Sequence, residues 1–179
     1  LKGVDVQVLS GPGSLEQIAQ LDDVDIVLTA VVGAVGLPAV LAAAKKGRRL
    51  AIANKEPLVI AGELLTKTVA DSGGVIMPID SEHSAVFQAM QAGSRDEVSR
   101  IILTSSGGPF RNLTEADMQN ATLETVLSHP VWNMGAKITV DSVTMMNKAL
   151  EVIEARWLFD MPVDKIDGRI QPEAIIRSL

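Results

Sequence analysis

The chain has 179 residues, of which 47% are hydrophobic and 21% charged, values typical of soluble globular domains and far from those of disordered chains. Its formal charge of −6, without a long Lys/Arg block, argues against a nucleic-acid-binding face. Because cysteine is absent, the sequence excludes disulfides, thiolate metal sites and a Cys nucleophile.

The first eighty residues alternate short β-branched runs with Ala/Leu-rich helical stretches. This alternation is typical of an α/β fold with parallel strands. We expect strands at residues 4–9, 25–32, 49–53 and 75–79, and helices at residues 14–21, 37–46 and 58–72. Four strands with three crossovers would form half of a doubly wound sheet.

An uncharged stretch, residues 26–44, is followed by the basic run KKGRR and has to be weighed as a membrane span. Gly33, Gly36 and Pro38 divide this stretch into a buried strand, a turn and a new helix. We therefore predict no membrane segment.

The rhythm changes after residue 80. We expect a short helix to about residue 90, strands at residues 98–104, 137–140 and 165–170, and a strong helix at residues 144–159. An apolar stripe recurs along that last helix at helical spacing, made by Met146, Ala149, Leu150, Ile153 and Trp157. The polar segment 105–135 is long enough to be a lid or binding loop, in which residues 114–127 could hold one or two helical turns.

Polar residues follow three of the predicted strands, at residues 54–56, 80–83 and 105–108. Ligands of open α/β sheets bind beyond the carboxyl ends of the strands, which makes these positions functional candidates. Asp80 and Glu82 lie two apart in an extended chain, so both carboxylates can converge on a hard divalent cation. Capping of the next helix by Asp80 or Ser81 explains the spacing equally well.

A third carboxylate comes from the predicted helix 144–159, where Asn147, Lys148 and Glu151 share a face opposite the apolar stripe. A solvated Lys/Glu pair is the alternative. Asp141 and Ser142 stand where this helix is predicted to begin, and free N–H groups there would attract an anion.

Other residues of the second half could complete a phosphate pocket. Residues 105–108, Ser-Ser-Gly-Gly, form either an anion cradle or a plain turn, and Lys148 offers a point charge for a phosphate. His83 is expected to pack or to form a local hydrogen bond. His129 and Trp132 of the long segment could close over a ligand, although Trp132 could also simply anchor the loop.

Four strings resemble one family: ANKEPLV, PIDSEHSAVFQ, LTSSGGPFR and HPVWNMGAKITVDSVTMMNKALEVIEARWLF. The family is that of the 1-deoxy-D-xylulose 5-phosphate reductoisomerases, and the resemblance covers essentially the whole chain. It implies an enzyme that depends on NADPH and on Mg²⁺ or Mn²⁺ and converts 1-deoxy-D-xylulose 5-phosphate to 2-C-methyl-D-erythritol 4-phosphate. A bound metal would chelate the carbonyl and a neighbouring hydroxyl of the substrate.

The resemblance also implies roles for individual residues. The metal ligands would be Asp80, Glu82 and Glu151, and the catalytic residues would be Lys55, Glu82 and His129. The cofactor contacts would be Asn54, Glu56 and Gly135. The substrate contacts would be Lys55, Ser81, Glu82, Ser106, His129, Trp132, Ser142, Asn147, Lys148 and Glu151.

At the level of the fold, the resemblance implies a partial Rossmann-like parallel sheet in residues 1–79, the C-terminal part of an NADPH-binding domain. An α+β catalytic domain with a flap at about residues 105–135 would follow in residues 80–179. A phosphosugar substrate, a homodimer, no nucleic-acid or membrane partner, and a location in a bacterial cytoplasm or a plastid stroma are expected.

By this resemblance the chain is expected to be a central part of the family's longer chain, which normally begins with a strand and a Gly-rich turn and continues past Leu179 into a C-terminal helical region. The family's Gly-rich G-x-T-G-S-I-G turn has no counterpart, so we expect the 179 residues by themselves to be inactive. The tail QPEAIIRSL resembles a segment of the type HPQSIIHSM, with Gln171 and Arg177 where histidines are usual, so a role for the second histidine is in doubt. A relative that binds metal and phosphosugar without turnover is the alternative function.

Overall fold

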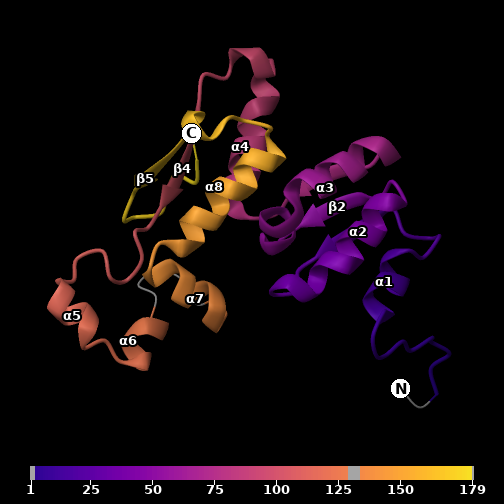
Figure 1. The fold of residues 1–179 in the computed structure, drawn as a ribbon, viewed down its shortest axis with the longest axis horizontal. Coiled ribbons are helices and arrows are strands. Elements are labelled where there is room, and N and C mark those ends of the chain that lie inside the picture. Colours follow the sequence, from indigo (N-terminus) through magenta and orange to yellow (C-terminus); the bar gives the residue numbers. More distant parts are fainter. Residues whose placement is uncertain (1–2, 129–133, 179) are drawn as a thin grey trace. The chain divides into compact units, whose positions relative to one another are not determined.

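The structure is a computed structural model that describes residues 3–128 and 134–178. The chain divides into two compact units, residues 1–77 and 78–179, which are described separately below. Both units mix helices with parallel strand pairs, which confirms the predicted α/β class. Figure 1 traces the elements in chain order.

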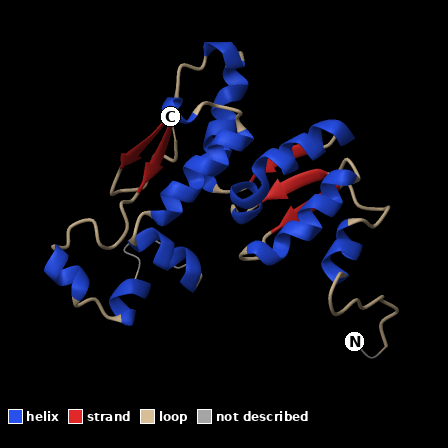
Figure 2. Ribbon diagram, viewed as in Figure 1, coloured by secondary structure: helices blue, strands red, loops and turns tan. Residues whose placement is uncertain are grey.

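The first unit is a small sheet with helices. Its sheet has the order β1-β2-β3, and β1 and β2 run parallel with Ile26 opposite Arg49 (Figure 2). The strands are β1 (Ile26–Thr29), β2 (Arg49–Ile52) and β3 (Val75–Pro78). The helices are α1 (Ser14–Ala19), η1 (Ala34–Gly36), α2 (Leu37–Lys45) and α3 (Glu56–Ser72).

Local signals account for the bounds of these elements. Pro38 lies in the first turn of α2 and Pro57 in the first turn of α3, where the missing N–H group costs no hydrogen bond. Gly47 follows α2 with φ +67°, and a Cβ there would stand 2.6 Å from the carbonyl oxygen of Ser72. The turn between α2 and β2 therefore requires glycine.

The core of the first unit is apolar. Leu50, Ile52, Leu58 and Leu65 are fully buried between the sheet and its helices. The uncharged stretch 26–44 is split into β1, η1 and α2. Within residues 3–128 and 134–178, no helix has both the length and the apolar character needed to cross a membrane.

The predicted strand at residues 4–9 is wrong. These residues form no strand, and Val4, Val6 and Val8 are exposed. Alternation alone does not make a strand, because its N–H and C=O groups need a neighbouring strand to pair with. The sheet formed by β1, β2 and β3 does not include this segment.

The second unit packs helices around a two-stranded parallel sheet, in which Ile101 of β4 lies opposite Ile166 of β5. The strands are β4 (Ile101–Ser105) and β5 (Ile166–Ile170). The helices are α4 (Ser81–Ala89), α5 (Glu115–Gln119), α6 (Leu123–Leu127), α7 (Ala136–Val143) and α8 (Met146–Leu158). Three short 3-10 turns are η2 (Met90–Ala92), η3 (Arg95–Glu97) and η4 (Val163–Lys165).

The predicted strand at residues 137–140 is also wrong, because these residues lie inside α7. The β-branched run Ile138-Thr139-Val140 favours a strand by propensity alone. Here the backbone N–H and the hydroxyl of Thr139 both donate to the carbonyl oxygen of Gly135, which closes a helical turn. Local hydrogen bonding thus overrides the strand propensity.

Helix α8 is oriented differently from the prediction. Met146 and Ile153 of the apolar stripe are exposed, whereas Lys148, Glu151 and Glu154 are buried. Ala155 joins the apolar core of the second unit, together with residues of α4, β4 and β5. That core consists of Val86, Ile101, Leu103, Ala155, Phe159, Met161 and Ile166. One side of α8 therefore carries acidic and basic groups into the interior.

Candidate active site

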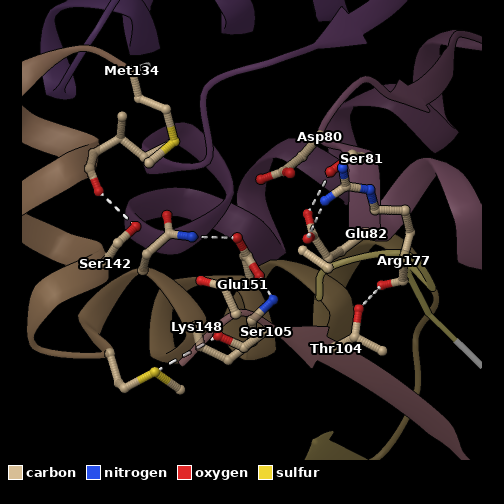
Figure 3. Close-up of a pocket in the computed structure, with 15 residues that line it drawn as sticks. Asp80, Ser81, Glu82, Thr104, Ser105, Met134, Ser142, Lys148, Glu151 and Arg177 are labelled. Carbon is tan, nitrogen blue, oxygen red and sulfur yellow. Dashed lines mark hydrogen bonds and ion pairs between the residues drawn. The ribbon is translucent and has the colours of Figure 1, made fainter. Parts of the chain in front are cut away.

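A cavity of about 350 Å³ lies within the second unit, where α4, α7, α8 and the end of β4 converge (Figure 3). It gathers most of the predicted metal and phosphate residues of this unit. Its lining consists of Asp80, Ser81, Glu82, Thr104, Ser105, Ser106, Met134, Ile138, Ser142, Met145, Asn147, Lys148, Glu151, Ala174 and Arg177.

Three carboxylates meet at one end of this cavity. Asp80, Glu82 and Glu151 each offer an oxygen, and these oxygens lie within 4.8 Å of one another. Asp80 occupies the N-cap position of α4, but its side chain forms no capping hydrogen bond. Asp80 therefore stands at the position of a helix cap, but its carboxylate does not cap the helix. A set of hard oxygen donors of this kind fits Mg²⁺ or Mn²⁺.

The electrostatics of Glu82 also fit a cation site. Burial raises the pKa of this carboxyl, and the neighbouring charge of Glu151 raises it further. Lys148 and a hydrogen bond from Ser81 act in the opposite direction, and the Ser81 hydroxyl donates to Glu82 Oε2 at 2.7 Å. Burial is thus the main cause of the raised pKa, and the nearby carboxylates add to it; a divalent cation would offset this second contribution.

Glu151 is held by its own helix. Its Oε1 accepts a hydrogen bond from Asn147 Nδ2 at 2.5 Å, and its Oε2 forms an ion pair with Lys148 Nζ. The Lys148 and Glu151 side chains are only 11% and 2% exposed, so the alternative of a solvated pair is wrong. Asn147, Lys148 and Glu151 thus form one buried cluster on the cavity wall.

Behind Glu151 lies a buried histidine. His83 is fully buried, stacks on Phe159 and has its Nε2 2.9 Å from the carbonyl oxygen of Glu151. Since a carbonyl oxygen only accepts, Nε2 must donate in this bond. Its Nδ1 lies 3.4 Å from Glu154 Oε2. The prediction that His83 packs in the interior is confirmed, but its hydrogen bond is to a distant residue of α8 and is not local.

The turn after β4 uses its own hydroxyls. The N–H groups of Gly107 and Gly108 donate to the hydroxyls of Ser105 and Ser106, at 3.1 and 3.2 Å. These glycine amides are therefore engaged within the turn, as the plain-turn alternative holds. A hydroxyl both accepts and donates, so the Ser106 hydrogen is what this residue would offer an anion.

Gly108 fixes the distance between this turn and α7. It has φ +69°, and a Cβ at this position would collide with the carbonyl oxygen of Ser142. Only glycine allows the two cavity walls to approach this closely. Ser142 itself lines the cavity, while its hydroxyl donates to the carbonyl oxygen of Ile138 at 2.9 Å.

The predicted anion site at a helix start is wrong. Asp141 and Ser142 lie in the last turn of α7, because the helix that follows begins only at Met146. The carboxylate of Asp141 pairs with Lys137 one turn earlier, at 2.7 Å. Ser142 keeps its place at the cavity through α7, without the free N–H groups of a helix N-terminus.

The predicted cofactor and substrate residues Asn54, Lys55 and Glu56 belong to the first unit, at the carboxyl end of β2 and the start of α3. Asn54 is buried, and among the described residues neither its Oδ1 nor its Nδ2 has a hydrogen-bond partner. The same holds for the buried hydroxyl of Thr29, at the end of the parallel neighbour β1. Such groups are unfavourable by about 1–3 kcal/mol each unless a ligand or water binds them.

Of three further predicted residues, the structure describes one. His129 and Trp132 fall outside the described residues. Gly135 is the exposed N-cap residue of α7 and does not line the cavity. Its role as a cofactor contact stays a prediction.

Sequence reasoning missed several lining residues. Thr104, Met134, Ile138 and Met145 carry no charge pattern that would have marked them. Arg177 was noted only as a departure from a family pattern, yet its side chain lines the same cavity. Glu154, which is fully buried beside His83 and does not line this cavity, was not singled out either.

Comparison with known families assigns both units. The family model "1-deoxy-D-xylulose 5-phosphate reductoisomerase C-terminal domain" matches residues 76–159, and the model "1-deoxy-D-xylulose 5-phosphate reductoisomerase" matches residues 1–62. The chain belongs to this reductoisomerase family.

Relatives in the family are similar along the whole chain. The reductoisomerase of Clostridium perfringens (strain ATCC 13124) is 48% identical over 178 residues, which are 99% of this chain and 46% of the relative. That of Chlorobium chlorochromatii is 51% identical over 173 residues, covering 97% and 45%. The chain thus spans about half the length of the curated relatives it matches.

Solved structures of the family have the same fold. A reductoisomerase described as a complex with NADPH, fosmidomycin and magnesium matches with a TM-score of 0.93 and 45% identity, over 99% of this chain and 46% of that one. A second, from Zymomonas mobilis in complex with NADPH, matches with a TM-score of 0.83 and 44% identity, over 92% and 42%.

Proposed function

We propose that this chain supplies the metal and substrate pocket of an NADPH-dependent reductoisomerase that converts 1-deoxy-D-xylulose 5-phosphate to 2-C-methyl-D-erythritol 4-phosphate. The observation that carries the proposal is the meeting of three carboxylates with Lys148, Asn147 and Ser142 in one cavity. Negative and positive groups within one pocket suit a substrate that has oxygens for a metal at one end and a phosphate at the other.

The carboxylates would hold the metal. Asp80, Glu82 and Glu151 present oxygens at mutual distances that a single ion can bridge. A bound Mg²⁺ or Mn²⁺ would supply Lewis-acid polarisation of the substrate oxygens. The hydrogen bond from His83 to the Glu151 carbonyl fixes the helix backbone from which this carboxylate extends.

The phosphate would bind beside the metal. Lys148 would supply a positive charge, while Ser106, Ser142 and Asn147 would supply neutral donors. Because Lys148 now pairs with Glu151, an arriving phosphate would share this ammonium group with the carboxylate. His129 and Trp132 of the flap would exclude water from the closed pocket, and Ser81 would contact the substrate backbone.

The first unit would bind NADPH. Asn54 and Glu56 are the proposed contacts of this unit, and the family resemblance also proposes Gly135 as a cofactor contact and Lys55 as a substrate contact. The buried, unsatisfied amide of Asn54 supports this assignment, because a ligand would supply its missing partners. A bacterial cytoplasmic location is proposed because the relatives are bacterial, and the homodimer stays a prediction from the family resemblance.

The decisive experiment measures NADPH oxidation by the full-length protein that carries this chain, with 1-deoxy-D-xylulose 5-phosphate and Mn²⁺. We expect turnover that disappears when a chelator removes the metal. Binding of metal and phosphosugar without any NADPH oxidation would instead establish a non-catalytic relative.

A further inference from the structure

Arg177 is brought to the cavity by its own backbone. The Thr104 hydroxyl at the end of β4 lies 2.7 Å from the carbonyl oxygen of Ile176 and 2.5 Å from that of Arg177. Ser178 adds an antiparallel bridge to Leu103. The segment that follows β5 is therefore fixed beside β4, and the Arg177 side chain extends from it over Glu82 (Figure 3).

The guanidinium meets a proposed metal ligand. Arg177 Nη1 lies 3.8 Å from Glu82 Oε1, and the two side chains are 30% and 14% exposed. At this distance the interaction is a charge contact rather than a hydrogen bond. The contact can therefore favour one orientation of the Glu82 carboxylate, and a metal ion can still displace it.

A cation of the chain thus stands beside two of the three proposed ligands. Lys148 pairs with Glu151, and Arg177 faces Glu82. The role of Lys148 is already assigned to the phosphate, but nothing so far gives Arg177 a role. An arginine stays charged at every pH at which the protein is folded, so it repels any divalent cation that approaches the same carboxylate.

We propose that Arg177 is an internal counter-ion of the metal site, which holds Glu82 while no metal is bound and lowers the affinity of the site for a divalent cation. This inference rests on the proposed metal site. On metal binding the guanidinium turns away from Glu82, and its partial exposure gives it room in solvent to do so. Arg177 is therefore a residue that tunes affinity and does not ligate the metal.

The test is calorimetric titration of Mn²⁺ into the full-length protein, without substrate or NADPH. We expect Arg177→Gln to bind Mn²⁺ about three- to tenfold more tightly, the factor that corresponds to a partly exposed ion pair. Arg177→Lys keeps the charge and should stay nearest to the parent. The matched control is Arg100→Gln. Arg100 pairs with Asp167, and neither residue lines the cavity.

Salt provides a second readout. Because ions screen the repulsion between Arg177 and the metal, the ratio of parent to Arg177→Gln affinities should shrink as NaCl is raised. If Arg177→Gln does not unfold cooperatively, Arg177→Leu removes the same charge and keeps an apolar stem for packing.

The outcomes are distinguishable. Unchanged or weaker Mn²⁺ binding by both charge-removing variants, in a parent that binds Mn²⁺, would overturn the counter-ion and leave the metal site intact. A parent that binds no Mn²⁺ would overturn the metal site and the counter-ion together. Equal tightening by Arg100→Gln would reduce the effect to net charge and also overturn the proposal.

Discussion

The carboxylate of Glu151 is held by several neighbours in the cavity. It is buried, accepts from Asn147, pairs with Lys148 and extends from a backbone position that His83 holds. These contacts leave the carboxylate few orientations, so a metal would meet an arranged oxygen rather than a mobile side chain.

We therefore predict that Glu151→Gln lowers Mn²⁺ affinity by about tenfold or more, because an amide oxygen carries no negative charge for the ion. The variant preserves the shape of the side chain, but its amide has one acceptor oxygen and can keep only one of the two contacts with Asn147 and Lys148. Titration calorimetry measures the change, with Glu63→Gln on an exposed position of α3 as the control. An affinity equal to that of the parent would remove Glu151 from the ligand set.

His83 permits a prediction about stability. Replacement by Phe would leave the Glu154 carboxylate without its imidazole neighbour and the Glu151 carbonyl without a donor. Loss of one member of a buried pair costs about 3 kcal/mol, so urea unfolding should show a decrease of that order in the free energy of unfolding.

The double variant His83→Phe/Glu154→Leu is the control for this effect. It removes both buried polar partners, so it should recover part of the loss. A double variant that is no more stable than His83→Phe would show that the pair itself is not the cause.

At the level of elements, charged side chains form ion pairs at the C-terminal end of α8. Asp160 follows the C-cap residue Phe159 with φ +45°, a conformation that Asp and Asn tolerate better than most residues. Its carboxylate accepts from Arg156 at 2.8 Å and lies 3.2 Å from Arg95. Hydrogen bonds from Arg156 and then Arg95 hold the pKa of Asp160 below its usual value.

This shift fixes the pH dependence of Asp160→Asn. The pKa of Asp160 is lower in the folded chain than in the unfolded chain. The carboxylate therefore stabilises the fold at every pH above its pKa in the unfolded chain. That contribution is lost as pH falls through the lower, folded value. The parent should therefore be more stable than Asp160→Asn at pH 7. The melting temperatures of the two proteins should approach each other as the pH falls below about 3.8. A difference in melting temperature between parent and variant that stays the same across the whole pH range would contradict this.

Most elements were predictable because their signals are local. Pro38 and Pro57 mark helix starts, Gly47 and Gly73 follow helix ends, and Thr114 and Thr122 cap the two short helices within the long polar segment. The strand at 4–9 and the strand at 137–140 failed because strand formation depends on a distant partner, which a local pattern cannot supply.

The candidate site was only partly predictable for a related reason. Asp80 and Glu82 are neighbours in sequence, but their approach to Glu151 depends on how α4 and α8 pack. Periodicity assigns apolar faces to the interior, so it could not indicate that Lys148, Glu151 and Glu154 are the buried face. The resemblance to family strings named Glu151 where the pattern alone left it open.

At the level of the whole molecule, the proposed chemistry divides between the two units. The three carboxylates and the phosphate residues belong to residues 78–179, whereas Asn54, Lys55 and Thr29 belong to residues 1–77. Each ligand should therefore leave its own pattern of protection from solvent exchange.

We predict that Mn²⁺ slows amide hydrogen exchange mainly in α4 and α8, which carry proposed metal ligands, because binding would stabilise the folded form of that unit. NADPH should instead slow exchange after β1 and β2. Exchange measured by mass spectrometry on the full-length protein, with metal-free, Mn²⁺-loaded and NADPH-loaded samples compared, provides the test. Equal protection of both units by Mn²⁺ would contradict the division.

The inverted burial of α8 has a consequence for mutational tolerance. In an ordinary amphipathic helix, substitutions at charged positions are accepted and those at apolar positions are harmful. Here Lys148, Glu151 and Glu154 are enclosed, while Met146 and Ile153 are exposed within the described chain. A saturation library across this helix should therefore enrich polar replacements at Met146 and Ile153. It should eliminate even conservative replacements at Lys148, Glu151 and Glu154. A ranking of these positions by hydropathy would predict the reverse.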